Sequence, residues 1–574
     1  MLAALGIVLD YGSNTQKFFG GQSSKVPKAV QHDDDILCLA LSPDRKLACT
    51  GQVGALPKLF VWDTETMAVK SQYKLTKNTR GIISCAFSVD GKYVAFCDNS
   101  NDHTLYVIES ATGTLKNSQK TGPDAPKGMA WSKKPGDYTV GVVGPKLIKF
   151  FKGVEGGEGK RGICGGDVMN WSAITGLPSG EFIAADSTGN LAIFKDNQMT
   201  KKVQVHGKPV DALNFVDGKV LSGGNDKKLN ILGTDLSVQS TIEFACSIKG
   251  CDMMGDKMVV GLKDATIIVV SGSDKKTVMK GHHDGEIWGL DVMGDNIVTS
   301  CDDNKVMLWN IPSHTNKSVF TINEKAGEKI KYGASSITHM PDNQCSRAVA
   351  VCPSLKQLAV ACNNGEIHIH SSENPDQMLD MKKDATRWIE RMIYSPNGKY
   401  LGVGTHDDKV YIYETAANGK YTLKGTCKGN SSYIMALDWT DDSQFIRCNS
   451  GAYEYLFYKI PECSQVTDGG TVTRDTHWAS NSDKLGWYVS GIYPPGAKGT
   501  DINVVERSIS EKYVASGDDW GLINIYRYPC RENAKAISLR GHSEHVVRVK
   551  FGSNDNYLYS VGGQDKAIMV WKKE

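Results

Sequence analysis

Few residues of this chain have the types and spacing that chemistry requires. His282 and His542 each follow a glycine, and they are the first histidines to consider as a general acid or base. Residues 157–162 have the spacing G-x-G-x-x-G, which cradles phosphate when a strand precedes it and a helix follows. Here the motif lies among polar residues with no following helical pattern, so we interpret it as a loop. No P-loop, G-x-S-x-G or H-E-x-x-H motif occurs. The sequence therefore predicts a protein that is not an enzyme and that has no cofactor, metal or small-molecule substrate.

The elements that must position these histidines are short strands. The last unit runs from residue 539 to 571 and has apolar strands at 546–551, 557–561 and 568–571. Turns rich in Gly, Asn and Asp separate them, which is the pattern of strands rather than helices. Repeats of about 40 residues built this way are typical of β-propeller blades.

Similar units can be followed along the whole chain. Seven lie near residues 36–63, 82–109, 127–151, 170–194, 209–232, 248–270 and 286–309, and five more near 348–370, 389–413, 434–458, 502–526 and 546–571. The stretch 475–494 provides a further, irregular blade. Closed rings hide the strand edges that each blade exposes. The prediction is an all-β protein with two tandem propellers, the first of about seven blades and the second of about six or seven.

The domain boundaries follow from the break in this pattern. Residues 312–345 are polar and interrupted by Pro and Gly, which is typical of an inter-domain connection. We therefore expect an N-terminal segment at 1–30, a first propeller at 31–311 and a second at 346–574. The strands at 6–10 and 15–20 are expected to pair with a blade late in the chain order and so close a ring.

Composition narrows the class of partner. The 66 Lys and Arg residues nearly balance the 64 Asp and Glu residues, for a formal net charge of +2. This balance does not indicate nucleic acid or a membrane surface as a partner. The 15 cysteines are scattered and none forms a C-x-x-C pair, which favours reduced thiols in a cytosolic protein. No apolar run approaches the length of about 20 residues that spans a bilayer.

The last unit closely resembles a WD-repeat. That resemblance assigns His542, Asp565 and Trp571 to the positions of the family pattern, with Ser560 as the strand hydroxyl. It implies a buried hydrogen-bond network from the histidine to the tryptophan ring, which satisfies polar groups that a blade must bury. The unit at 286–309 has the matching residues His282, Asp303 and Trp309. A structural role for these histidines is therefore favoured over a catalytic one.

Several longer stretches resemble the echinoderm microtubule-associated protein-like family. They include HDDDILCLALSPDRKLACTGQVG, VTRDTHWAS, GTDINVV and VASGDDWGLINIY. The resemblance implies tandem atypical propellers and an association with tubulin, microtubules and other microtubule-associated proteins. Family members carry a hydrophobic HELP segment ahead of the first blade, and this sequence begins partway through it. Many members also have a coiled coil and a basic linker, which are missing here.

The family-specific stretches contain the candidate contact residues Arg474, Asp475, His477, Trp478, Asp501 and Asn503. Two roles are open for these residues: packing of the irregular blade and contact with a partner. The expected function is a non-catalytic cytoplasmic protein of the cytoskeleton or of a ciliary axoneme that binds tubulin through propeller surfaces. The alternative is a tandem-propeller scaffold for actin turnover or for a signalling complex.

Overall fold

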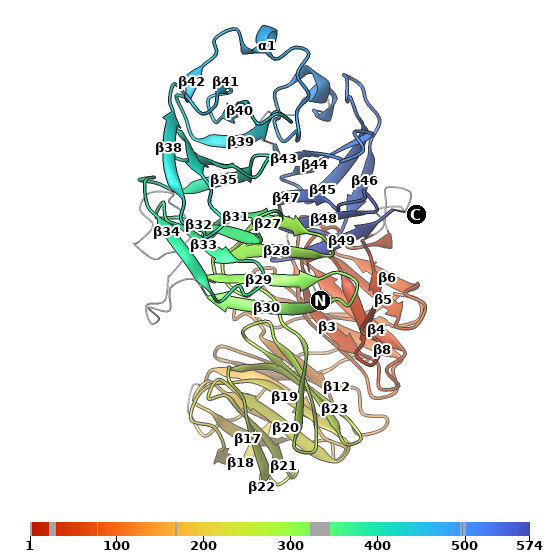
Figure 1. The fold of residues 1–574 in the computed structure, drawn as a ribbon. Coiled ribbons are helices and arrows are strands. Elements are labelled where there is room, and N and C mark those ends of the chain that lie inside the picture. The colour runs from red at the N-terminus through yellow and green to blue at the C-terminus, as the bar shows by residue number, and fades with distance from the viewer. Residues whose placement is uncertain are drawn as a thin grey trace. The chain divides into compact units, whose positions relative to one another are not determined.

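The computed structural model describes residues 3–21, 30–76, 79–166, 169–321, 345–493, 496 and 501–573. It is almost entirely β-structure, and the chain divides into two compact units (Figure 1). The first unit contains residues 3–21 and 30–283 of the described chain, and the second begins at Asp284. Each unit is a set of small antiparallel sheets whose strands follow one another in chain order, so the predicted tandem propellers are confirmed.

The first unit holds six four-stranded sheets and one two-stranded sheet among its described residues. The two-stranded sheet is β1 (Gly6–Asp10) with β2 (Thr15–Phe19). The first three four-stranded sheets are β3 (Ile36–Leu41), β4 (Leu47–Gln52), β5 (Lys58–Asp63), β6 (Val69–Lys74); β7 (Ile82–Phe87), β8 (Tyr93–Asp98), β9 (Thr104–Glu109), β10 (Leu115–Lys120); and β11 (Gly128–Trp131), β12 (Thr139–Gly144), β13 (Leu147–Lys152), β14 (Lys160–Arg161). The other three are β15 (Trp171–Gly176), β16 (Phe182–Asp186), β17 (Asn190–Lys195), β18 (Gln198–Gln204); β19 (Val210–Val216), β20 (Lys219–Gly224), β21 (Lys228–Leu232), β22 (Val238–Glu243); and β23 (Ile248–Met254), β24 (Lys257–Leu262), β25 (Ile267–Ser271), β26 (Asp274–Met279).

Two expectations for this unit are wrong in detail. The strands at 6–10 and 15–20 pair with each other in the hairpin β1–β2, and not with a strand late in the chain order. The predicted loop at 157–162 contains strand β14, which pairs with β13 as the fourth strand of its sheet. Strand β14 has only two residues, which is too short for an alternating pattern to distinguish an outer strand from a loop in sequence.

The second unit holds five four-stranded sheets and one three-stranded sheet among its described residues. The strands are β27 (Ile287–Met293), β28 (Asn296–Cys301), β29 (Lys305–Asn310), β30 (Thr315–Thr321); β31 (Ser346–Cys352), β32 (Gln357–Cys362), β33 (Ile367–Ser371), β34 (Met378–Lys382); β35 (Ile389–Tyr394), β36 (Tyr400–Thr405), β37 (Val410–Glu414), β38 (Thr422–Cys427); β39 (Ile434–Trp439), β40 (Phe445–Ser450), β41 (Tyr455–Lys459), β42 (Ser464–Gln465); β43 (Ile502–Arg507), β44 (Tyr513–Asp518), β45 (Leu522–Arg527), β46 (Ile537–Arg540); and β47 (Val546–Phe551), β48 (Tyr557–Gly562), β49 (Ile568–Lys572). A short helix α1 (Gly469–Val472) and a 3-10 helix η2 (Trp487–Ile492) lie between β42 and β43.

The boundary between the units differs from the predicted one. The sheet β27–β30, expected to end the first propeller at residue 311, belongs to the second unit. Its first strand packs between β31 and β47, so it joins the first and last parts of that unit's chain. Closure of the ring is a long-range contact that the repeat pattern alone does not specify. Most of the predicted connection at 312–345 lies outside the described residues, although strand β30 occupies 315–321.

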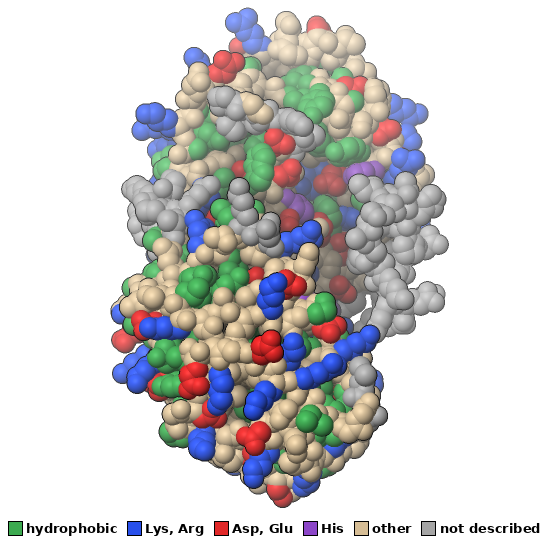
Figure 2. All heavy atoms as spheres, turned by 180° about the vertical axis from the view of Figure 1, so that it is seen from behind, with side chains coloured by type: hydrophobic (Ala, Val, Ile, Leu, Met, Phe, Trp, Pro, Cys, Tyr) green, Lys and Arg blue, Asp and Glu red, His purple; other side chains and the backbone are tan. Residues whose placement is uncertain are grey.

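The position of a strand in its sheet explains its sequence. Second strands such as β8 are buried along almost their whole length and are rich in Val, Ala, Phe and Cys. Fourth strands such as β10, with sequence LKNSQK, are largely exposed and polar. A strand covered on both faces needs apolar side chains at every position, whereas an outer strand faces water. All 15 cysteines are free, and many lie in these buried strands. On the face of the molecule seen in Figure 2, basic and acidic side chains are interspersed.

Candidate functional site

The irregular segment, residues 466–493, lies where the second unit departs from its sheet pattern. Its backbone bridges two neighbouring first strands: the Ala479 N–H donates to Trp439 O at 2.9 Å, and the Arg507 N–H donates to Asn481 O at 3.1 Å. Trp478 forms an isolated antiparallel bridge with Thr440. The segment thus contacts β39 and β43 without forming a sheet of its own. An irregular blade with strand content was expected at 475–494; in the described part of that range the only strand pairing is this bridge, and Pro494 lies outside the described residues.

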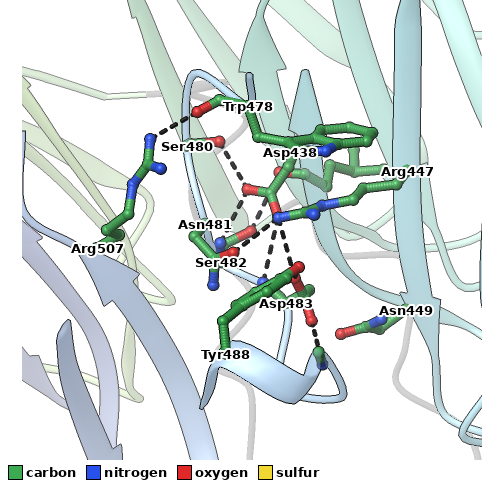
Figure 3. Close-up of polar contacts among 12 residues, drawn as sticks. Asp438, Arg447, Asn449, Trp478, Ser480, Asn481, Ser482, Asp483, Tyr488 and Arg507 are labelled. Carbon is green, nitrogen blue, oxygen red and sulfur yellow. Dashed lines mark hydrogen bonds and ion pairs between the residues drawn. The ribbon is translucent and has the colours of Figure 1, made fainter. Parts of the chain in front are cut away.

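Arg447 lies at the centre of this segment's contacts, and Figure 3 shows the cluster around it. The side chain extends from β40 and is only 3% exposed. Its Nη2 atom donates to Asn481 Oδ1 at 2.7 Å and lies 3.2 Å from Asp438 Oδ2 and 3.0 Å from Asp483 Oδ2. A buried guanidinium between two carboxylates meets its hydrogen-bonding needs within the protein.

The two carboxylates are held in different environments. Burial opposes ionisation of Asp438, but the Arg447 charge and hydrogen bonds from Ser480 Oγ at 2.6 Å and the Ser482 N–H at 2.8 Å outweigh it and lower its pKa. Burial dominates at Asp483 and raises its pKa, because the nearby Asp438 charge adds to desolvation. Both carboxylates contact the same guanidinium, and their hydrogen bonds and burial shift their pKa values in opposite directions.

Aromatic rings enclose the same guanidinium. The Arg447 guanidinium carbon is 4.0 Å from the Trp478 ring centroid, 5.2 Å from that of Tyr488 and 5.8 Å from that of Tyr455. The hydroxyls of Tyr455 and Tyr488 are 2.7 Å apart, and Tyr488 also donates to Asp483. Stacking on several rings stabilises a desolvated cation. The half-buried Trp478 thus packs on Arg447 within the segment.

The other predicted contact residues lie nearer the surface. Arg474, Asp475 and His477 are exposed. His477 bridges two acids, with Nδ1 2.6 Å from Asp441 Oδ2 and Nε2 2.5 Å from Glu511 Oε1. On the far side of the segment, partly buried Asn503 donates to Asp519 Oδ1 at 2.9 Å, and the Asp519 N–H donates to Asp501 O at 3.1 Å. Of the six candidates, Arg474, Asp475 and His477 are exposed, whereas Trp478, Asp501 and Asn503 are half-buried.

The blade network expected from the WD-repeat pattern is present in the last sheet. His542 Nδ1 is 2.9 Å from Asp565 Oδ2, and its Nε2 is 2.8 Å from Ser560 Oγ. The Trp571 Nε1–H donates to the same Ser560 oxygen at 2.9 Å. His542 and Asp565 have fully buried side chains. A serine next to a histidine and an aspartate here satisfies buried polar groups, and the site lacks access for a substrate.

The sheet that contains residues 286–309 shows corresponding contacts, and His282 is buried. The Trp309 Nε1–H donates to Thr299 Oγ1 at 2.8 Å, and Asp303 accepts from the Lys305 N–H at 2.9 Å. Thr299 thus takes the hydroxyl position that Ser560 holds in the last sheet.

Two further networks in the first unit escaped sequence reasoning. His206 lies 3.0 Å from Asp226 and 2.9 Å from Ser222, with no tryptophan. His32 contacts Gln52 and Thr50, each at 2.8 Å, and the Trp62 Nε1–H donates to Thr50 at 3.1 Å. Both networks could have been predicted from the spacing between the histidine and the hydroxyl residue. His206 precedes Ser222 by 16 residues and His32 precedes Thr50 by 18, compared with 18 between His542 and Ser560. A search for Gly-His pairs misses both histidines.

Charged groups on the first strands of the second unit form ion pairs within the protein. Arg548 donates to Glu390 Oε1 at 2.8 Å, and His406 lies 3.3 Å from Glu390 Oε2. Burial raises the pKa of Glu390, but these two partners outweigh it and bring the pKa to about 2. Lys550 donates to Glu506 at 2.8 Å. These pairs tie first strands together rather than present a free acid or base.

Comparisons with known proteins agree with this picture. Residues 30–269 match the model for the echinoderm microtubule-associated protein first beta-propeller, and residues 287–573 match that for the second beta-propeller. The chain is 40% identical over 592 residues to the ciliary WD repeat-containing protein ctxp80 of Euplotoides octocarinatus, covering all of this chain and 82% of that protein. It is 30% identical over 607 residues to echinoderm microtubule-associated protein-like 2 of Mus musculus, covering all of this chain and 88% of the relative. Against echinoderm microtubule-associated protein-like 4 of Xenopus laevis the identity is 27%, and the chain spans 62% of that protein.

Neither family model describes a catalytic domain. In the described part of the chain, no helix has the length and apolar character needed to cross a bilayer.

Proposed function

Since this chain belongs to the echinoderm microtubule-associated protein-like family, we propose that it is a non-catalytic microtubule-associated protein of the cytoskeleton or of a ciliary axoneme. The ciliary name of one relative and the microtubule-associated names of the others support this assignment. The single observation that carries it is the match of both propeller models, which together cover most of the chain.

The mechanism we propose is shape-complementary contact by rigid propeller loops with tubulin or with other microtubule-associated proteins. Formal charges nearly cancel, and on the face seen in Figure 2 both signs are mixed. Adhesion to an acidic surface by bulk positive charge is therefore a poor explanation, and binding should depend only moderately on salt.

The exposed side of the irregular segment is the contact surface that we favour within the second unit. Arg474, Asp475 and His477 are exposed there, on a backbone fixed by the buried Arg447 cluster beneath. Loops held on a rigid scaffold are frequent sites of recognition. Asp501 and Asn503 flank the same segment at the start of β43.

Co-sedimentation with assembled microtubules tests the function. The full chain should pellet with microtubules across a series of salt concentrations, with less than about a tenfold loss of affinity between low and physiological salt. Actin filaments serve as the matched control polymer. A protein that stays in the supernatant at every salt concentration, also alongside axonemal extract proteins, contradicts the assignment.

A pair of variants tests the contact surface. Arg474→Glu with Asp475→Lys reverses both exposed charges and should weaken pelleting severalfold without changing the thermal unfolding midpoint. The matched control is Lys92→Glu, an exposed charge reversal in a turn of the first unit. Equal binding of both variants would place the contact elsewhere.

A further inference from the structure

Two cysteines meet at the junction between two sheets of the second unit. Cys427 ends the outer strand β38 and is completely buried. Cys463 follows strand β41 in a turn whose neighbouring residues are exposed, and it is half-buried. Both side chains pack in the apolar cluster that joins the sheet β35–β38 to the sheet β39–β42, and both thiols are free. The two residues lie 36 positions apart in the chain, so only the fold brings them together.

Gly425 makes room for the Cys463 side chain on β38. A Cβ built at Gly425 would lie 2.6 Å from Cys463 Sγ and 3.2 Å from Cys463 Cβ. These distances are too short to be tolerated, so any larger residue at Gly425 would push Cys463 away from the strand. Gly425 and Cys427 are two positions apart and therefore face the same side of β38. The Cys463 sulfur thus lies over the strand face from which the Cys427 thiol projects.

The ordinary use of this turn position is apolar packing. Met67 and Leu236 hold the same place, four residues after the third strand of their sheets, with φ of 60° and 67° compared with 53° at Cys463. Leu236 is buried in a core cluster of the first unit. Packing alone therefore does not require a thiol at this position, because an apolar residue serves there as well.

The two thiols shift each other's acidity in opposite directions. Hydrogen bonding with Cys427 lowers the pKa of Cys463, although partial burial and the Glu462 charge oppose the shift. The same interaction, together with burial, raises the pKa of Cys427. Cys463 is therefore the thiol that ionises first, and it is also the one that lies nearer to solvent. An accessible thiolate reacts with oxidants, whereas a buried thiol is inert.

A pair of neighbouring thiols in the first unit shows the contrast. Hydrogen bonding with Cys85, together with burial, raises the pKa of Cys38. At Cys85 the bond with Cys38 has the opposite effect, but the Cys49 thiol and burial outweigh it and raise the pKa. Neither Cys38 nor Cys85 is thus set up to ionise, although they lie as neighbours in the same core cluster.

We propose that Cys463 is a peroxide-reactive thiol and that Cys427 converts its oxidised form to an intramolecular disulfide. The Cys463 thiolate attacks one oxygen of hydrogen peroxide, so that the S–O bond forms, the O–O bond breaks and hydroxide leaves. The Cys427 sulfur then attacks Sγ of the sulfenic acid at Cys463. The S–S bond forms, the S–O bond breaks, and the oxygen leaves as water with the Cys427 proton. The two thiols lose two electrons in all, and one peroxide is reduced to water.

The disulfide would fasten the outer strand of one sheet to a turn of the next. Strand β38 is exposed along much of its length and has β37 as its strand partner in the sheet. Local opening of a fold begins in such weakly held elements. Oxidation would therefore hold this junction of the second unit closed. This inference does not depend on microtubule binding.

Peptide mapping of the full-length chain tests the proposal. The reduced protein is exposed to hydrogen peroxide, the remaining thiols are alkylated, and the chain is digested with trypsin without reduction. Lys428 and Lys459 lie between the two cysteines, so trypsin releases residues 425–428 and residues 460–474 as separate peptides unless a disulfide joins them. We expect these two peptides to appear as a linked pair, and the intact product to run as a monomer without reducing agent.

Two substitutions separate the role of the thiol from that of the geometry. Cys463→Leu removes the reactive thiol and keeps an apolar residue, as Leu236 does at the same turn position. It should abolish the linked pair and leave the unfolding midpoint of the reduced chain unchanged. Gly425→Ala keeps both thiols but displaces Cys463, so it should lower the yield by about fivefold or more, because a disulfide requires close approach of the two Cβ atoms. Cys164→Ser, at a half-buried cysteine of the first unit, is the matched control and should not change the yield.

The pair Cys38 and Cys85 is the internal control, since it should stay reduced under the same exposure. The proposal is overturned if the wild-type chain gives no linked pair at a peroxide concentration that oxidises free cysteine in the same buffer. It is also overturned by a disulfide that joins Cys463 to any thiol other than that of Cys427, including one on a second chain. A yield that Gly425→Ala leaves unchanged, or equal oxidation of Cys38 and Cys85, would contradict it as well.

Discussion

The guanidinium of Arg447 stacks on the indole of Trp478 at 4.0 Å, although the two residues come from β40 and from the irregular segment. Trp478 also accepts a hydrogen bond through its carbonyl from Arg507 Nη2 at 2.6 Å, so one residue joins the two sheets that flank the segment (Figure 3). A buried ionic cluster, rather than a run of strand hydrogen bonds, therefore replaces a regular sheet at this point of the second unit. Such a cluster fixes one geometry, because every member depends on the others.

Replacing Arg447 with methionine should destabilise the chain by about 3–5 kcal/mol, since it leaves two buried carboxylates without their cation. Chemical denaturation of the full chain, followed by tryptophan fluorescence, measures this loss. The triple variant Arg447→Met, Asp438→Asn, Asp483→Asn should recover part of it. A single variant as stable as the wild type would show that the carboxylates are not paired as described.

Removing the Ser560 hydroxyl should cost more than removing that of Ser222. Ser560→Ala deprives both His542 and Trp571 of a partner, whereas Ser222→Ala deprives only His206. A buried group left without its hydrogen bond costs about 1–3 kcal/mol, so the difference should be about 1 kcal/mol or more. Thermal unfolding of the two variants side by side measures it, and an equal or reversed order would contradict the network.

His32 should make the first unit sensitive to acid. Burial, with a smaller contribution from the Lys58 charge, lowers its pKa from 6.5 to about 4, although its bond to Gln52 opposes the shift. The unfolded chain then binds a proton that the folded chain does not, so stability falls as the pH drops from about 6.5 to about 4. The loss from this one group is about 3 kcal/mol. NMR titration of the histidine ring signals, assigned by comparison with His32→Gln, should give a pKa below 5; a value near 6.5 would refute the prediction.

His545 should give the stability of the second unit the opposite pH dependence. Its hydrogen bond with Glu286, at 3.3 Å, raises the pKa of His545. Burial raises the pKa of Glu286, but His545, Gln564 and the Arg347 charge together outweigh it and lower that pKa. The contribution of His545 to the free energy of unfolding is fully present below its unfolded-state pKa of about 6.5. It is lost as the pH rises through the higher pKa of the folded state. The Glu286 contribution is present above about 4.5 and is lost as the pH falls. His545→Gln should therefore cost more stability at pH 5.5 than at pH 8.5, as measured by urea denaturation at the two pH values. Equal losses at both would show that the pair does not form.

Much of the fold could be read from the residues of single strands. The approximate strand ranges and the tandem propellers follow from short-range patterns of apolar alternation and Gly and Asp turns. The last sheet's network of His542, Ser560, Asp565 and Trp571 was implied by the resemblance of that stretch to a WD-repeat. These patterns are local because each blade is one continuous stretch of chain.

Tertiary structure alone decided which sheets are neighbours. The unit at 286–309 has the same local pattern whichever ring it joins, and only the packing of β27 between β31 and β47 assigns it to the second unit. Likewise, Trp478 has no local signal that separates a packing role from a surface role. The packing of Trp478 on Arg447 arises from a contact between residues 31 positions apart in the chain, which the local sequence does not encode.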